Sequence, residues 1–447
     1  MPNDLEKSLI SKPSTHRVEH APELWVNPSL MDAGPVLEAS IISMADVKAA
    51  EARLLRYAPA LIVLFPELAV SGGIIESPLL PLGAMPRPAL ADGSSAGQLW
   101  IKADHALPIA GSVKARGGIH EVLEFAESLA LQYGLLERAA DYTALTAPPA
   151  RALFSRYEIA VGSTGNLGMS IGIMASALGF RVTVHMSADA RQWKKDKLRT
   201  HGVHVIEYAG DYAQAVHAGR EQANQDPYCY FVDDEQSLSL FLGYSVAALR
   251  LQPQLQAAGI AVDSQHPLFV YLPCGVGGAP AGISFGLKQL FGNTVHCFFV
   301  EPTSSACFLT RMRHPGQPGI SVYDAGMDNH SQADGLTVPV ASELAIAQMR
   351  HLLSGVATTS DASMFIDLYR LQQTQGIKVE PSAAAAVSGP RMLLQTAQGQ
   401  DYLHRQGLLP HMAQANHILW STGGLFVPSV EYHGFLEHGR TLAQAAQ

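Results

Sequence analysis

The sequence predicts an α/β protein with two parallel-sheet domains and flanking helices. Short β-branched runs alternate with amphipathic stretches from Tyr157 onward, and the alternation returns from Leu268 onward. Such alternation is typical of βαβ units, which build parallel sheets. Gly- and Ser-rich loops stand where several strand-like runs meet helix-like stretches. With 447 residues, 47% of them hydrophobic, the chain can fill more than one core.

The first series predicts a small domain over residues 151–239. Its expected strands are YEIAVG, RVTVHM, HVIEYA and YCYFVD. The expected helices between them cover residues 166–177, 190–200 and 211–224. Each helix would then be the crossover that joins two parallel strands.

The second series predicts a large domain over residues 76–150 and 240–447. Its expected strands are LFVYLP, VHCFFV and HILWS, and residues 281–290 are expected to form a helix. Residues 1–75 carry Pro and polar breaks and no chemical motif. We therefore expect them to form an N-terminal extension that wraps around the domains.

The composition favours a cytoplasmic protein that acts on a small molecule. A formal net charge of −9 disfavours a nucleic-acid partner, because such a partner calls for a basic face. No Lys/Arg block suits a membrane surface, and the longest apolar runs, such as residues 58–65, are far shorter than a membrane span. The four cysteines form no Cys-x-x-Cys pair and no zinc spacing, which predicts the reduced thiols of a cytoplasmic protein.

Two glycine-rich loops could hold an anion. Residues 162–168, GSTGNLG, follow a strand and open a helix, where backbone N–H groups point forward and the helix dipole favours negative charge. Residues 273–282, PCGVGGAPAG, stand in the same position after a later strand, and their glycines let the backbone curl into a phosphate nest. Taken singly, the first loop also fits an ordinary capped turn, and the second fits a tight turn between packed elements.

The second loop also partly matches a dinucleotide-binding fingerprint. Gly275 and Gly277 follow a strand, and Glu301 ends the next strand. Pro280, however, stands in the place of the third glycine. The incomplete match disfavours a nicotinamide enzyme.

Two further loops carry candidate reactive groups. Lys114 lies in GSVKARGG, on the opening turn of an expected helix, and Thr422 lies in WSTGG, directly after the last clear strand. A hydroxyl at the end of a strand can meet a ligand across the carboxyl edge of the sheet. A helix lysine is nevertheless more often a solvated group, and Ser-Thr-Gly-Gly is common in turns. Neither loop alone identifies a function.

Together, and in this order, the four loops resemble the pyridoxal phosphate enzymes of fold type II, the tryptophan synthase β family, and within it the bacterial dehydratases that act on D-serine. The matching stretches span about residues 100–430 and are KADHALPIAGSVKARGGIHEV, AVGSTGNLGMSIG, FVDDEQSLSLFLGY, YLPCGVGGAPAG, HCFFVEP, ADGLTV, VEPSAAA and STGG. The resemblance is specific because several separated motifs agree.

The resemblance implies which residues hold pyridoxal 5'-phosphate. Lys114 matches the lysine that carries the cofactor covalently, and Asn166 matches the asparagine at the cofactor's ring oxygen. Thr422 matches the residue that faces the pyridine nitrogen. The phosphate-binding loop of the family corresponds to Gly275, Val276, Gly277 and Gly278.

The resemblance also implies where the substrate lies. The turn of Ser163, Thr164 and Gly165 matches the site for its carboxylate. From the mechanism, Asp233 and Asp234, in FVDDEQS, are expected near its hydroxyl. Asp234 also fits a solvated residue at the end of a strand. Lys114 is the candidate base for the Cα proton, but a base on one face serves only one enantiomer. Thr164 is therefore a second candidate catalytic residue, on the opposite face.

Two departures from the family pattern concern the ligands. Val276 and Ala279 stand where the glycine-rich loop usually has glycine, and the first position needs to supply only a backbone N–H. Cys307 stands six positions after Glu301, where related enzymes that bind a divalent cation have an acidic residue. We therefore expect no divalent metal site, while a monovalent cation stays compatible with the sequence.

The resemblance implies a lyase that removes water and then ammonia from D-serine to give pyruvate, and that also accepts D-threonine. The alternatives on the same fold are an L-serine or threonine dehydratase and a serine racemase. A non-catalytic binder of pyridoxal phosphate or amino acids is a further alternative, which Lys114 disfavours because binding alone needs no such lysine. The family pattern also leans towards a monomer.

Overall fold

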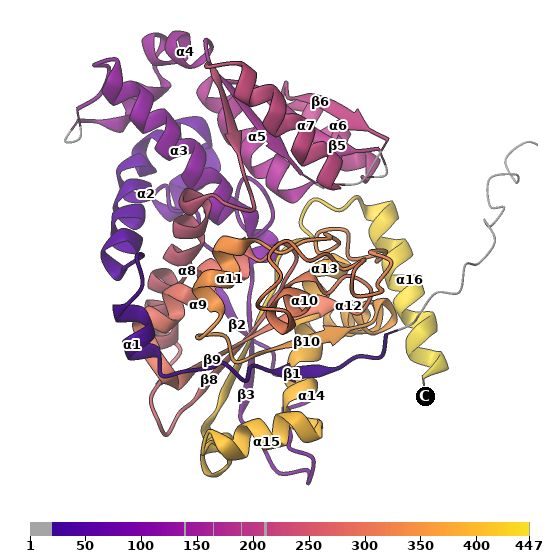
Figure 1. The fold of residues 1–447 in the computed structure, drawn as a ribbon. Helices are drawn as coiled ribbons and strands as arrows, with labels where there is room; N and C mark the ends of the chain where they lie inside the picture. Colours follow the sequence, from indigo (N-terminus) through magenta and orange to yellow (C-terminus); the bar gives the residue numbers. More distant parts are fainter. Residues whose placement is uncertain (1–19, 138–139, 164, 189, 210–211, 447) are drawn as a thin grey trace, which may run out of the picture.

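The computed structural model describes residues 20–446 apart from 138–139, 164, 189 and 210–211. It confirms the predicted α/β class, with two sheets whose inner strands run parallel. Figure 1 shows the small sheet with its helices at the top and the large sheet below it. Helix α3 (Lys114–Gln132) reaches into both units, because it packs on α5 (Asn166–Leu178) and on α8 (Leu238–Ala257).

The large sheet has seven strands, of which the two outermost pair antiparallel with their neighbours. Its spatial order is β1 (Leu24–Val26), β10 (Gly355–Thr359), β9 (Val295–Pro302), β8 (Leu268–Pro273), β11 (Asn416–Trp420), β3 (Gln98–Lys102) and β2 (Leu79–Pro81). Both edges are therefore supplied by the N-terminal quarter of the chain.

The central strands are apolar on both faces, as a sheet covered by two helix layers requires. In β8, Leu268, Val270 and Leu272 pack into one core, and Phe269 and Tyr271 pack into the other. Helices α2 (Met44–Leu64), α3, α8 and α9 (Gly278–Phe291) cover the first face. Helices α12 to α16 cover the second.

The small sheet has four parallel strands in the order β6 (His204–Tyr208), β5 (Arg181–Ser187), β4 (Glu158–Gly162) and β7 (Cys229–Val232). Helices α5, α6 (Gln192–Thr200) and α7 (Tyr212–Gln225) connect these strands. The predicted order of strands and helices in this region is confirmed, with ends that differ by one or two residues.

The remaining elements complete the two layers. The helices are α1 (Ala33–Glu38), α4 (Pro148–Phe154), α10 (Cys307–Arg313), α11 (Glu343–Met349), α12 (Asp361–Gln375), α13 (Pro381–Ala384), α14 (Ser388–Gln395), α15 (Ala397–Arg405) and α16 (Ser429–Ala445). Short 3-10 turns are Pro66–Ser71, Asp104–Ala106, Tyr142–Thr146, Gly292–Thr294, Ala385–Val387 and Leu409–Gln414.

The structure departs from the sequence-based expectation at the start of one helix, in the N-terminal region, and in four unpredicted strands, β1, β2, β3 and β10. Helix α9 begins at Gly278 rather than at residue 281, because a proline in the first turn, here Pro280, costs a helix no hydrogen bond. Part of the expected N-terminal extension is built into the large sheet, since β1 pairs with β10. The domain boundaries at residues 75, 150 and 239 stay a prediction.

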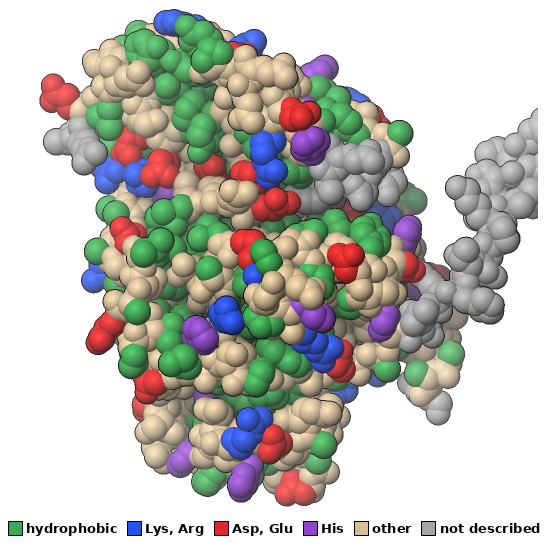
Figure 2. Space-filling view, viewed as in Figure 1, with side chains coloured by type: hydrophobic (Ala, Val, Ile, Leu, Met, Phe, Trp, Pro, Cys, Tyr) green, Lys and Arg blue, Asp and Glu red, His purple; other side chains and the backbone are tan. Residues whose placement is uncertain are grey.

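Two features, the described helices and the surface charge, bear on a membrane or nucleic-acid partner. Among the described residues, no helix combines the length and the apolar character needed to cross a bilayer. On the face drawn in Figure 2, Lys and Arg side chains are interspersed with Asp and Glu rather than gathered into one basic area.

A buried ionic cluster joins the start of α3 to the large sheet. The guanidinium of Arg116 donates to Asp104 Oδ2 at 2.6 Å and to Glu76 Oε2 at 3.0 Å. Lys102 Nζ donates to Glu76 Oε1 at 2.6 Å, and Trp420 Nε1 donates to Asp104 Oδ2 at 2.8 Å. Burial opposes ionisation of Glu76, but Arg116 and Lys102 outweigh it and lower the pKa of Glu76 to about 2. Arg116 is thus a structural cation.

Replacing Arg116 tests this cluster. We expect Arg116→Met to lower the free energy of unfolding by about 3–5 kcal/mol, because two carboxylates would stay buried without their main partner. Urea titration followed by circular dichroism measures the change. The control is Arg440→Met, which removes an exposed guanidinium paired with Glu437 and should leave stability nearly unchanged. Equal effects of the two substitutions would contradict the assignment.

Candidate active site

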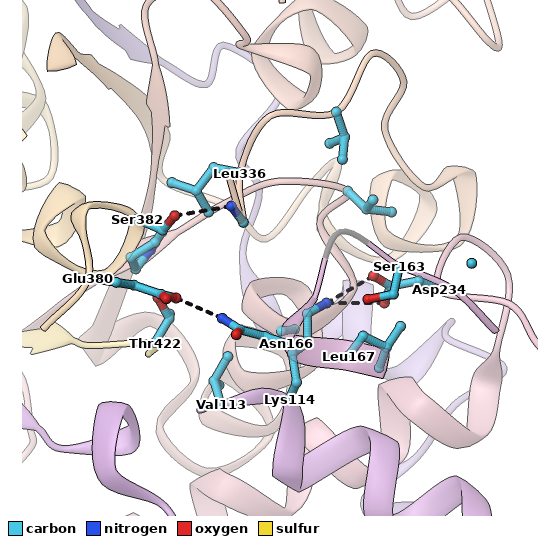
Figure 3. Close-up of a pocket in the computed structure, with 16 residues that line it drawn as sticks. Val113, Lys114, Ser163, Asn166, Leu167, Asp234, Leu336, Glu380, Ser382 and Thr422 are labelled. Carbon is cyan, nitrogen blue, oxygen red and sulfur yellow. Dashed lines mark hydrogen bonds and ion pairs between the residues drawn. The ribbon is translucent and has the colours of Figure 1, made fainter. Parts of the chain in front are cut away.

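A cleft of about 630 Å³ lies between the two sheets, at the carboxyl ends of β4, β8 and β11. Ligands of α/β proteins bind at this edge. The cleft is lined by Val113, Lys114, Gly162, Ser163, Asn166, Leu167, Asp234, Pro273, Val276, Ala279, Gly335, Leu336, Val338, Glu380, Ser382 and Thr422. Figure 3 shows Glu380 and Thr422 on one side of it and Ser163 and Asp234 on the other.

Lys114 presents its amine inside the cleft rather than to bulk solvent. It is the first residue of α3, and its side chain is 20% exposed. Lys114 Nζ donates to Asp234 Oδ2 at 2.9 Å and to Oδ1 at 3.2 Å. The preceding loop is tied to the loop of Thr422, because Val113 N donates to Thr422 O at 2.8 Å. The sequence-predicted lysine and threonine loops are thus held side by side.

The glycine-rich loop between β8 and α9 forms a nest of unused donors. Among the described residues, no acceptor is recorded for the backbone N–H groups of Gly275, Val276 or Gly277. Gly277 has φ +106°, and a Cβ on it would meet the Phe308 ring at 2.7 Å. Because consecutive free N–H groups at a helix N-terminus attract anions, the backbone of Gly275 to Gly278 could hold an anion such as a phosphate.

Buried groups support this loop from below. Cys307 Sγ donates to Gly275 O at 3.2 Å. Glu301 accepts from Phe308 N and Leu309 N, each at 2.8 Å, while burial raises the pKa of Glu301 to about 8. Over the part of the chain that the structure describes, no group of three or more His, Cys, Asp and Glu is arranged to hold a metal ion.

The turn between β4 and α5 exposes a second set of backbone donors. Ser163 Oγ accepts from Gly165 N and Gly168 N, each at 2.9 Å, so this hydroxyl caps the helix. The N–H groups of Asn166 and Leu167 have no recorded acceptor among the described residues. Thr164, the predicted second catalytic residue, lies outside the described residues. The turn can therefore accept a carboxylate at the α5 N-terminus.

Glu380 is the main site residue to which the sequence analysis gave no role. Its Oε1 accepts from Asn166 Nδ2 at 2.7 Å, which turns the carboxamide oxygen of Asn166 away from Glu380. Burial raises the pKa of Glu380. Ser382, two residues further, accepts from Gly335 N at 3.2 Å. The sequence did point to these residues, because the stretches VEPSAAA and ADGLTV, which contain them, both belong to the resemblance. Their spacing in the sequence alone, however, does not show that the two stretches contact each other.

The Thr422 hydroxyl is a buried polar group that lacks a partner. Its Oγ1 is shielded from solvent and makes no hydrogen bond to any described residue. Such an atom costs free energy unless a ligand satisfies it. An amine, an anion nest and an unsatisfied hydroxyl therefore line one cleft, which fits the aldehyde, phosphate and ring nitrogen of pyridoxal phosphate.

Comparison with known proteins gives a family match. Residues 70–403 match the family described as "Pyridoxal-phosphate dependent enzyme". A protein of Acidovorax ebreus named "Probable D-serine dehydratase" is 58% identical over 429 residues, which is 94% of each chain. Proteins of the same name from Chromobacterium violaceum and Pseudomonas putida are 54% and 53% identical, again over 94% of each chain.

Solved structures share the fold at low sequence identity. Diaminopropionate ammonia lyase from Escherichia coli, in complex with D-serine, is 17% identical with a TM-score of 0.69, covering 96% of this chain and 98% of that one. A serine racemase from Dictyostelium discoideum is 17% identical with a TM-score of 0.59, covering 87% and 100%. These structures support the fold class.

Replacing Lys114 tests covalent cofactor attachment. We expect borohydride to fix pyridoxal phosphate to the wild-type chain, on the peptide that contains Lys114, and to fix none to Lys114→Ala. Mass spectrometry of the digested protein measures this. Lys48→Ala removes an exposed lysine of α2 and should retain the fixed cofactor. Fixation at another lysine of the wild type would contradict the assignment.

Removing the unsatisfied hydroxyl of Thr422 should stabilise the cofactor-free protein but weaken cofactor binding. Thr422→Val should raise the unfolding free energy of the cofactor-free protein by about 1 kcal/mol and weaken pyridoxal phosphate binding up to roughly tenfold. Urea titration and absorbance titration measure the two effects. Thr358→Val is the control, because Thr358 Oγ1 accepts from Glu23 N at 2.9 Å and its loss should destabilise. Destabilisation of cofactor-free Thr422→Val would refute the argument.

Proposed function

The chain belongs to the family of pyridoxal-phosphate dependent enzymes, and from this premise we propose that it is a lyase that converts D-serine to pyruvate and ammonia. The observation that carries the proposal is the 58% identity, over 94% of both chains, to a relative named for D-serine dehydration. The cleft agrees with it, because Lys114 and Val276, a member of the glycine nest, line the same cavity. D-threonine, which differs by one methyl group, is proposed as a second substrate.

The residues of the cleft divide the work of binding. Pyridoxal phosphate, when bound, supplies an aldehyde for an amine and a ring that withdraws electrons from the Cα of an attached amino acid. We assign its aldehyde to Lys114 and its phosphate to the N–H groups of Gly275 to Gly278. Asn166, oriented by Glu380, would meet the ring oxygen, and Thr422 the ring nitrogen.

The substrate would be oriented by the turn that opens α5. The free N–H groups of Asn166 and Leu167 and the dipole of this helix favour a carboxylate beside Ser163 and Gly165. A carboxylate held there leaves the substrate hydroxyl free to face Asp234. Asp234 accepts two hydrogen bonds from Lys114 Nζ, so the carboxylate and the amine lie within proton-transfer distance of each other.

Lys114 and Asp234 would then move the protons. The Lys114 amine is the candidate to accept the Cα proton on its own face, and Thr164 is the candidate on the opposite face. The neutral Thr422 hydroxyl, unlike a carboxylate, does not hold a positive charge on the ring nitrogen. We infer that this choice favours loss of the β-hydroxyl over racemisation.

We also propose that the enzyme works as a cytoplasmic monomer without a nucleic-acid partner. The four cysteines, which are all free and three of them buried, and the net charge of −9 support this proposal. A monovalent cation as a second cofactor stays a prediction. Comparing activity in potassium and in tetramethylammonium buffers tests the cation, and sedimentation tests the monomer.

A pyruvate-release assay tests the proposed reaction. The enzyme, saturated with pyridoxal phosphate, should release pyruvate from D-serine at least roughly 100-fold faster than from L-serine, because one carboxylate site and one base fix one enantiomer. D-Threonine should yield 2-oxobutanoate. Chiral chromatography of the unreacted serine serves as the control for racemisation. Faster turnover of L-serine, or serine that racemises without pyruvate, would reject the proposal.

A further inference from the structure

A buried cation lies directly behind the turn that opens α5. Gly165, in this turn, has φ +150°, and the three atoms nearest to a Cβ built on it all belong to the Lys194 side chain. Lys194 Nζ lies 3.2 Å from that position. The side chain of Lys194 is only 2% exposed and comes from the first part of α6. Gly165 therefore leaves the space that the lysine fills.

Lys194 reaches across from the small sheet to the large unit. Its Nζ donates to Asp334 Oδ2 at 2.8 Å, and Asp334 directly precedes Gly335 in the wall of the cleft. Arg191, the residue directly before α6, pairs with Glu431 of α16 at 2.7 Å and lies 3.9 Å from Asp334. Figure 1 shows α6 and the upper end of α16 facing each other. The α5 turn is thus backed by a charged contact between the two units.

Lys194 is charged despite its burial. Burial disfavours the ammonium form, but the carboxylates of Asp334 and Glu380 outweigh this effect and raise the pKa of Lys194. Asp334 is 29% exposed, so solvent screens it more than it screens the ammonium. The ammonium is also nearer to Gly165 than its carboxylate partner is, since no Asp334 atom is among the three nearest. The backbone at Gly165 therefore lies nearer to this ammonium than to the Asp334 carboxylate, while Glu380 contacts the turn at Asn166, at 2.7 Å.

We propose that Lys194 is a positioning residue that makes the active site specific for substrates carrying an α-carboxylate, acting from behind Gly165 rather than by contact. The inference rests on the proposed function, which puts the substrate carboxylate at this turn. A cation within about 6 Å of a carboxylate in a poorly solvated region strengthens binding by roughly 10- to 100-fold. The helix dipole alone contributes less.

The chain offers a matched control in the next residue. The side chain of Lys195 is also 2% exposed, and its ammonium forms an ion pair with Glu207 at 2.7 Å. Its Nζ additionally donates to Ala188 O at 2.6 Å, so all its partners lie within the small unit. Lys195→Met therefore removes a buried cation of the same helix without removing charge from behind Gly165.

The test measures binding of two unreactive ligands that differ only in the carboxylate. D-Alanine has the α-carboxylate, D-alaninol has a hydroxymethyl group instead, and neither has a leaving group. Each is titrated into the holoenzyme and followed by the absorbance of the bound cofactor. We expect Lys194→Met to weaken D-alanine binding by about 10- to 100-fold and to leave D-alaninol binding within about twofold. Lys195→Met should change neither, and Lys194→Arg should restore most of the D-alanine affinity.

Asp334→Asn separates the charge from the contact between the units. It breaks the same ion pair as Lys194→Met but keeps the cation. Unchanged or tighter D-alanine binding supports the proposal, whereas weakening equal to that of Lys194→Met overturns it. Equal loss of both ligands in Lys194→Met also overturns it. The test measures ligand binding and not turnover. If the wild-type enzyme failed to turn over D-serine, the proposed function would be refuted, but the proposed role of Lys194 would still be decided by the binding measurements.

Discussion

The hydrogen bond from Val113 N to Thr422 O, with the bridge from Ser112 to Gly423 beside it, joins the two loops on which the cleft depends. One loop starts α3 and carries the amine of Lys114, and the other ends β11 and carries the unsatisfied hydroxyl of Thr422. Since β11 lies between β8 and β3, this contact also fixes both groups relative to the glycine nest that follows β8. The relative positions of Lys114, Thr422 and the glycine nest thus follow from strand order in one sheet.

The small unit adds the side of the cleft to which we assign the substrate. Its first strand, β4, delivers Ser163 and the start of α5 to the same cleft, and the loop after β7 delivers Asp234 to Lys114. Asn166, from the small unit, donates to Glu380 of the large unit, so the orientation of the Asn166 carboxamide depends on both units. Any change in how the units meet would act on the reacting groups directly. This arrangement explains why the charged contacts of α6 lie so close to the chemistry.

Much of this organisation could be predicted from the sequence. The strands YEIAVG, LFVYLP and VHCFFV were found because parallel strands buried on both faces are short apolar runs, and Lys114, Asn166 and Thr422 do line one cleft. The strands β1, β2, β3 and β10 were missed, because three to five residues carry too little periodicity and most of their pairing partners are distant in sequence. Glu380 and Lys194 were missed for a related reason: their roles depend on contacts between segments far apart in the chain, which no local spacing encodes.

The strands of the large sheet come from distant parts of the sequence, and this affects how the protein folds during synthesis. Strand β3 (Gln98–Lys102) pairs with β11 (Asn416–Trp420), and β1 pairs with β10 (Gly355–Thr359), whereas the strands of the small sheet all lie between Glu158 and Val232. Strands so far apart in the sequence can pair only after a long loop has closed, and this requirement slows folding of the large sheet. On the ribosome, the small sheet can assemble as soon as its own segment has emerged. The large sheet must wait until β11 has emerged, so nascent chains expose its earlier apolar strands until that point, and chaperone demand should concentrate in that interval.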